Sequence, residues 1–183
     1  MFLVMRTLRI PALLHDVFGE RQSPASLALI LLSMPLAVLA VWPALSALEL
    51  WRALLAALLV ADIAAGAVAN VTRGTNDHYA ASARRRTIFL AVHVHLPVVA
   101  LLMRLPLIPA LVAWALTIIA GTIIVLPPLS AVQRPASATA VIAILSITTL
   151  FSDTTTALLF VTALFAIKVV LSFAVDHSRA TGR

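Results

Sequence analysis

The sequence predicts an all-α protein, a polytopic membrane helical bundle in which a short interfacial N-terminal helix precedes six transmembrane helices. Of its 183 residues, 62% are hydrophobic and only 11% are charged, which is far more apolar than a soluble domain tolerates. The apolar residues fall into six runs, each about long enough to cross a hydrocarbon core of roughly 30 Å. Arginines gather in the loops that one side of such a bundle would share.

The first segment, residues 2–21, mixes apolar with charged residues and is too polar to span a membrane. Pro11 limits regular helix within it. The composition suits a segment that lies at the membrane surface with its apolar side in the lipid. We therefore expect residues 1–23 to form a cytoplasmic, interfacial amphipathic segment, and we expect no removable signal peptide.

Six predicted spans follow and together form a transmembrane domain over residues 24–175. They lie near residues 24–46, 50–71, 87–103, 106–129, 136–152 and 154–175. The fifth run is short and rich in serine and threonine, so a full span and a re-entrant hairpin are both consistent with it. In the third run Pro97 cannot donate to the carbonyl of His93, which predicts a kink that leaves this carbonyl free.

The arginine distribution predicts the orientation. If the N-terminus is inside, ten arginines fall on the cytoplasmic side and only Arg52 and Arg104 fall outside. Trp42 and Trp51 bracket the first outer loop, and indoles favour the membrane interface. We therefore expect a protein integral to the cell (inner) membrane, with the N-terminus and a tail over residues 176–183 both cytoplasmic.

Composition also excludes several kinds of site. The chain has no cysteine, so disulfides, thiolate metal sites and a cysteine nucleophile are ruled out. The net charge of +6 comes almost entirely from arginine. In a membrane protein such an excess reports orientation and contact with anionic headgroups, so the expected partners are membrane lipids and not nucleic acid.

One face of the second span is small and polar, because Asp62, Gly66 and Asn70 recur every four residues. This face must look into the protein. Gly66 permits the close approach of another helix, either within the chain or from a second subunit in a homo- or hetero-oligomer. Helix packing and ligand binding are equally good explanations for the presence of Gly66 and Asn70 on this face.

Four ionisable residues are predicted to share a layer in the cytoplasmic half of the bundle. Counted at about 1.5 Å per residue from the cytoplasmic ends of the spans, Asp62 lies on the order of 15 Å deep and His95 roughly 13 Å deep. By the same count His93 and Lys168 lie roughly 10 Å deep. A charge at such depth costs on the order of 3 kcal/mol unless it is paired, which makes Asp62 a candidate site residue. Lys168 can either pair with Asp62 or extend along its aliphatic stem to the interface.

The predicted catalytic residues are Asp62, His93 and His95. A carboxylate that orients an imidazole raises its basicity, which suits acid-base catalysis or proton relay, although a structural hydrogen bond would place the residues in the same way. On a regular helix His93 and His95 would point about 200° apart and could not bind one metal ion. We therefore expect one histidine beside Asp62, the other facing a neighbouring helix or a water-filled cleft, and no metal or cofactor.

The loop over residues 72–86 combines a turn-forming sequence with three consecutive arginines. Guanidinium groups bind phosphate headgroups through two parallel hydrogen bonds, but anchoring at the cytoplasmic interface also explains them. The candidate substrate-binding residues are Asn70, Arg73, His78, Tyr79, Arg84, Arg85, Arg86 and Lys168.

Three classes of function fit these residues. The first is an enzyme that acts on a lipid or isoprenoid substrate by acid-base chemistry, with the substrate entering between the second and third spans. The alternative is a permease or the substrate-binding subunit of a transporter, in which Asp62 and Lys168 bind a polar solute or relay a proton. A further alternative is a non-catalytic assembly partner that docks through the face of Gly66.

Overall fold

A computed structural model describes residues 7–12, 15–72, 74–76, 83–126, 129 and 131–175, and most of them are helical. The helices are α1 (His15–Phe18), α2 (Pro24–Ala40), α3 (Trp42–Leu45), α4 (Leu50–Ala69), α6 (Ala83–Val92), α7 (His95–Leu102), α8 (Leu107–Val125), α9 (Gln133–Thr149) and α10 (Thr156–Ala166), which continues as the π-helix η3 (Ile167–Phe173). The strands β1 (Leu8–Arg9) and β2 (Arg21–Gln22) precede α2.

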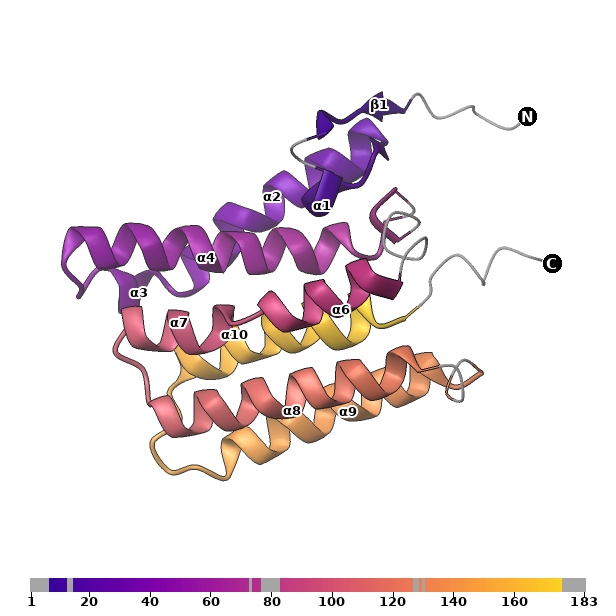
Figure 1. The fold of residues 1–183 in the computed structure, drawn as a ribbon. Helices are drawn as coiled ribbons and strands as arrows, with labels where there is room; N and C mark the ends of the chain where they lie inside the picture. The colour runs from indigo at the N-terminus through magenta and orange to yellow at the C-terminus, as the bar shows by residue number, and fades with distance from the viewer. Residues whose placement is uncertain are drawn as a thin grey trace.

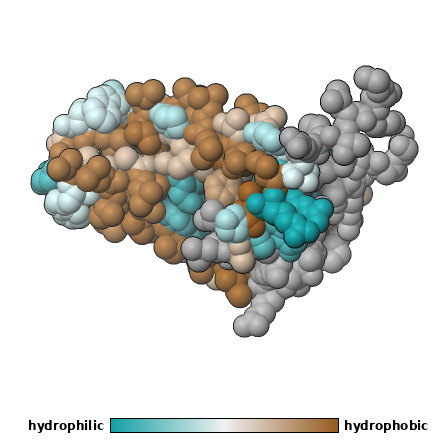
Figure 2. All heavy atoms as spheres, turned by 90° about the horizontal axis from the view of Figure 1, so that it is seen from above, coloured by the Kyte–Doolittle hydropathy of each residue, from teal (hydrophilic) through white to brown (hydrophobic). Residues whose placement is uncertain are grey.

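Three of the described helices are long and apolar enough to cross a membrane: Leu50–Ala69, Leu107–Val125 and Thr156–Phe173. Pro24–Ala40 and Ile88–Leu102 are apolar but shorter. Figure 2 shows hydrophobic side chains over much of one face, with hydrophilic ones concentrated toward one end. This surface is compatible with a membrane protein, because large side chains such as Leu58 and Ile142 are exposed along the helices.

The helices run back and forth between two ends of one bundle (Figure 1). The first described strand, β1, and the last described residues lie at the same end, which we call the β1 end. Three turns lie at the opposite end, which we call the α3 end: the turn that contains α3, the turn over residues 103–106 and the turn over residues 150–155. An even number of crossings would give this arrangement.

The core lies where α4, α7 and α10 with η3 pack together. Fully buried side chains from these helices include Val60, Ile63, Leu96, Val99, Phe165 and Val169. The buried face of α4 is otherwise built from alanine and Gly66, and such small residues allow helices to approach closely in a membrane. This close packing brings the polar residues of α4 against η3 and α7.

At the α3 end, ion pairs join the start of α4 to the turn after α7. Glu49 contacts Arg104 and also Arg52, at 3.5 Å in the second case. A hydrogen bond from its own backbone lowers the pKa of Glu49 below the usual range, and Arg104 and Arg52 add to this effect. Arg52 Nη1 also donates to the carbonyl of Leu101 at 3.0 Å, which joins the first turn of α4 to the last turn of α7.

The N-terminal segment forms a hairpin in its described part, where the sequence predicted a single amphipathic helix. Leu8 pairs with Gln22 and Arg9 with Arg21 in antiparallel register, and α1 between the strands has four residues. Two residues explain the difference. Pro11 cannot donate a helical hydrogen bond, and Gly19 has a φ of +71°, in the left-handed region that favours glycine.

This hairpin is attached to the turn after α4. The side chain of Gln22 is buried and donates to Phe18 O and Thr72 Oγ1, both at 2.6 Å. The backbones of Gly19 and Gly74 approach so closely that a Cβ on either glycine would overlap the other segment. The turn expected after the second span is therefore a packed contact with the N-terminal segment.

Candidate functional site

An ion pair between α4 and η3 lies at the centre of the candidate site. Lys168 Nζ donates to Asp62 Oδ2 at 2.7 Å, and the Lys168 side chain is only 6% exposed whereas Asp62 is 35% exposed. The alternative in which Lys168 extends to the interface is therefore wrong. A buried ammonium without a partner would be costly, and the carboxylate of Asp62 is within its reach.

Gly66 makes room for the lysine. It lies one turn after Asp62, and a Cβ at this position would overlap Lys168 Cε and lie only 2.9 Å from Cδ and 3.0 Å from Nζ. The aliphatic part of Lys168 thus fills the gap on the small face of α4. The group that approaches Gly66 closely, as predicted, is therefore the Lys168 side chain of the same chain.

Side-chain hydrogen bonds connect η3 to the second half of α4. Asn70 Nδ2 donates to Lys168 O at 3.3 Å, and Ser172 Oγ donates to Ala67 O at 2.7 Å. A π-helix shifts the hydrogen-bonding pattern of the backbone, and such segments are frequent at functional sites. Asn70 therefore contacts the backbone of the residue that pairs with Asp62.

His95 is the second partner of Asp62. Its Nε2 lies 3.3 Å from Asp62 Oδ2, and its side chain is 23% exposed. A carboxylate oxygen is an acceptor, so this contact favours the neutral tautomer that carries its proton on Nε2 and has a lone pair on Nδ1. Nδ1 is buried and has no hydrogen-bond partner in the described part of the chain.

The helix that carries both histidines is broken. α6 ends at Val92 and α7 begins at His95, so His93 and Val94 lie between two helices. The predicted release of the His93 carbonyl by Pro97 is confirmed, and the structure supplies a partner: Trp114 Nε1 on α8 donates to His93 O at 2.8 Å.

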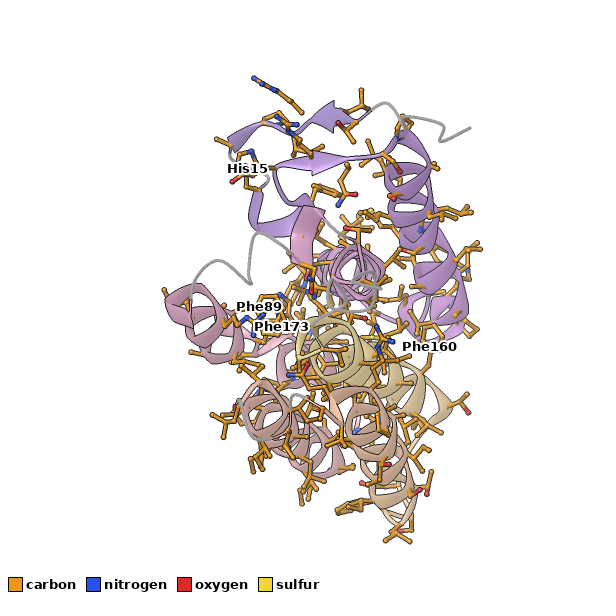
Figure 3. All side chains as sticks on the ribbon, turned by 90° about the vertical axis from the view of Figure 1, so that its right-hand side faces the viewer. His15, Phe89, Phe160 and Phe173 are labelled. Atoms are coloured by element: carbon orange, nitrogen blue, oxygen red, sulfur yellow. The ribbon has the colours of Figure 1, made fainter. Side chains whose placement is uncertain are left out.

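The break changes how the two histidines are related. Their ring centroids lie 5.1 Å apart, so the expectation that they point to opposite faces is wrong, because it assumed a regular helix. His93 Nδ1 hydrogen-bonds to Phe89 O, and its ring stacks on Phe89 at 3.7 Å. Phe89 in turn stacks on Phe173, also at 3.7 Å, and Figure 3 shows these two rings side by side.

The edge of the layer adjoins an apolar surface. Asp62 and His95 are partly exposed, and Leu58 lies one turn from Asp62 toward the α3 end and is exposed. Val98, which is also exposed, has the same relation to His95 on α7. Lys168 and His93 lie deeper. A group that approaches from the exposed side of α4 and α7 would therefore meet Asp62 and His95 first.

A second polar feature lies at the β1 end. Asn70, Thr75, Asn76, Arg86 and Phe173 line a hollow there. Phe173 connects this hollow to the buried layer, since it stacks on Phe89, which stacks on His93. Asn70, which donates to Lys168 O, is a second link between the hollow and the layer.

The predicted substrate-binding residues do not all meet at one place. Lys168 belongs to the ion pair, and Asn70 and Arg86 line the hollow. Arg84 and Arg85 belong to α6, and their side chains lie outside the described part of the structure, as do Arg73, His78 and Tyr79 altogether. Among the residues that are described, no group of three or more histidine, cysteine, aspartate or glutamate side chains is placed to hold a metal ion.

Sequence reasoning missed Trp114, Phe89 and Phe173. Trp114 could have been identified from the sequence, because an indole N–H within an apolar span needs an acceptor and the carbonyl of His93, freed by Pro97, is one. Nothing in the sequence pointed to the two phenylalanines, whose contacts depend on how α6 and η3 pack.

Comparison with known proteins finds no matching family model, no matching curated protein and no matching solved structure.

Proposed function

We propose that the protein is a membrane-embedded enzyme that acts on a lipid or isoprenoid substrate by acid-base chemistry at Asp62, His93 and His95. One observation carries the proposal: Asp62 Oδ2 lies 3.3 Å from His95 Nε2, at the edge of a layer that adjoins an apolar surface. A carboxylate held against an imidazole is an arrangement that positions a general base, and the apolar surroundings suit a substrate that arrives from the lipid.

In this proposal the chain crosses the membrane six times, with the β1 end in the cytoplasm. The arginine distribution and the shared end of β1 and the last described residues support it. The substrate enters between α4 and the broken helix α6–α7 from the cytoplasmic leaflet. Asn70 and Arg86 at the hollow hold an anionic headgroup there.

The residues of the layer have separate roles in the reaction. His95 Nδ1 accepts a proton from the substrate, and Asp62 holds the imidazole and stabilises the imidazolium that forms. Lys168 keeps Asp62 ionised through the ion pair. A positioned general base of this kind contributes about 10²–10⁴-fold to a rate, so loss of the imidazole should abolish most of the activity.

The test compares membrane lipids from cells that normally make the protein and carry His95→Phe or Asp62→Asn in place of the wild-type residue. Both variants should change the lipid profile in the same way as deletion of the whole protein. Thr122→Val on α8 is the matched control, because its hydroxyl bonds within its own helix to Ile118 O, and it should leave the profile unchanged. A wild-type profile in a well-expressed His95→Phe strain would refute the enzyme.

The ion pair also favours a second candidate, a proton-coupled permease. Lys168 and Asp62 connect η3 to α4, so protonation of Asp62 would release the contact between two helices. In that case purified protein in sealed vesicles would carry solute when a pH gradient is imposed, and Asp62→Asn would uncouple transport from the gradient. The lipid profile of the His95→Phe strain would then stay normal.

A further inference from the structure

Two buried imidazole nitrogens, His93 Nε2 and His95 Nδ1, have no hydrogen-bond partner among the residues that the structure describes. The other nitrogen of each ring contacts an acceptor, Phe89 O for His93 and Asp62 Oδ2 for His95. Because both contacted groups are acceptors, these contacts favour the tautomers with protons on His93 Nδ1 and His95 Nε2. The two remaining nitrogens are therefore lone pairs that require a donor, since buried acceptors are nearly always satisfied.

The two histidine rings lie close together, so one partner with two donors is the simplest way to satisfy both nitrogens. Their centroids are 5.1 Å apart and their planes are inclined at 44°. Neither ring is free to turn away, because Phe89 stacks on His93 and Asp62 holds His95. The missing partner must therefore come to the histidines.

The charges nearby favour a neutral partner. Asp62 carries one negative charge and Lys168 already balances it at 2.7 Å. An ammonium group or a metal ion between the histidines would add positive charge beside Lys168 without a further carboxylate in the described layer. A neutral group with two donor hydrogens satisfies both lone pairs without that cost.

We propose that the layer binds a neutral lipid whose headgroup donates two hydrogen bonds, such as the vicinal diol of a monoacylglycerol. One hydroxyl donates to His93 Nε2 and the other to His95 Nδ1, while the acyl chain leaves past Leu58 and Val98 into the lipid. This inference rests on the acid-base site proposed for the same layer, and it assigns that site a neutral headgroup in place of the anionic headgroup proposed at the hollow. It also explains why the edge of the layer is open on an apolar side.

The test uses the purified full-length protein, labelled with ¹⁵N-histidine, in phosphatidylcholine nanodiscs. Three probes with the same chain length are titrated: monooleoylglycerol with two donors, oleyl alcohol with one and methyl oleate with none. Monooleoylglycerol should bind roughly tenfold more tightly than oleyl alcohol, which is the size of one buried hydrogen bond, and methyl oleate should bind most weakly. The resonances of His93 Nε2 and His95 Nδ1 should both shift with the diol.

His93→Phe keeps an aromatic ring against Phe89 but removes one acceptor. It should bind monooleoylglycerol and oleyl alcohol equally, whereas Thr122→Val should keep the wild-type preference. Equal binding of the three probes by the wild-type protein would overturn the proposal, and this comparison decides the matter even if His93→Phe does not fold. One equivalent of a transition metal in the purified protein, with both nitrogens unresponsive to the diol, would overturn it as well.

The outcomes separate this inference from the proposed enzyme. A preference for the diol together with normal lipids in the His95→Phe strain would remove the enzyme and keep the binding site. Altered lipids in that strain, without any preference for the diol, would keep the enzyme and remove the diol as its substrate.

Discussion

Among single residues, Gly66 controls whether Lys168 reaches Asp62. A Cβ on Gly66 would occupy the space of Lys168 Cε, so Gly66→Ala should displace the lysine and weaken the ion pair. We expect a loss of about 1–3 kcal/mol in the free energy of unfolding, as for other overpacked sites. Denaturant unfolding in detergent measures it.

Gly121→Ala on α8 is the control for this change. A Cβ there would lie 3.1 Å from Val169 Cγ1 and 3.4 Å from Leu90 Cδ2, which are contacts that a small shift relieves. Gly121→Ala should therefore lose clearly less free energy of unfolding than Gly66→Ala. If both variants lose the same stability, Gly66 acts through general packing and not through the seat of Lys168.

The residues of the layer could be predicted from the sequence better than their contacts. Counting along each span placed Asp62, His95 and Lys168 at similar depth, and the structure brings the three together. Depth is set by the rise per residue, whereas contact also depends on which face each helix presents. The face that a helix presents depends on tertiary packing. The sequence therefore could not decide whether Lys168 pairs with Asp62 or extends to the interface.

Among the elements, the break between α6 and α7 was half predicted. Pro97 indicates which carbonyl loses its donor, but the donor that replaces it, Trp114 on α8, comes from another helix. Trp114→Phe keeps the ring and removes the N–H, so the buried carbonyl of His93 loses its partner. We expect a loss of about 1–3 kcal/mol in the free energy of unfolding.

The matched change is Trp51→Phe at the α3 end, where the side chain is exposed. Both substitutions remove one indole N–H, but only the one at Trp114 leaves a hydrogen bond of the site unmade. The same ¹⁵N-histidine spectrum should move at His93 in Trp114→Phe and stay unchanged in Trp51→Phe. A larger stability loss at Trp51 would contradict this account of the break.

The N-terminal hairpin was the element least accessible to sequence reasoning. Its strands have two residues each and are separated by a segment that contains α1, so they give no alternating pattern of the kind that identifies a strand. Its position depends on the hydrogen bond from Gln22 to Thr72 and on the close approach of Gly19 to Gly74, both between segments far apart in the sequence. Composition predicted an interfacial segment, and composition carries no information about such distant contacts.

For the whole molecule, composition predicts the class of fold but leaves the number of crossings open. Leu50–Ala69, Leu107–Val125 and Thr156–Phe173 meet the length of a span, whereas α2 and α9 have 17 residues each and Ile88–Leu102 contains the break. Hydropathy averages over a window and does not register where a helix ends. The count of six therefore depends on these three shorter elements.

Labelling of introduced cysteines tests the count directly, because the native chain has none and gives no background. Ser46→Cys and Ser152→Cys lie at exposed positions at the α3 end, and Ala131→Cys is exposed in the turn between α8 and α9. With six crossings and a cytoplasmic N-terminus, a membrane-impermeant maleimide should label the first two in intact spheroplasts and the third only after permeabilisation. If Ser152→Cys instead behaves like Ala131→Cys, then α9 does not cross, and the serine- and threonine-rich run is the re-entrant hairpin that its composition also allows.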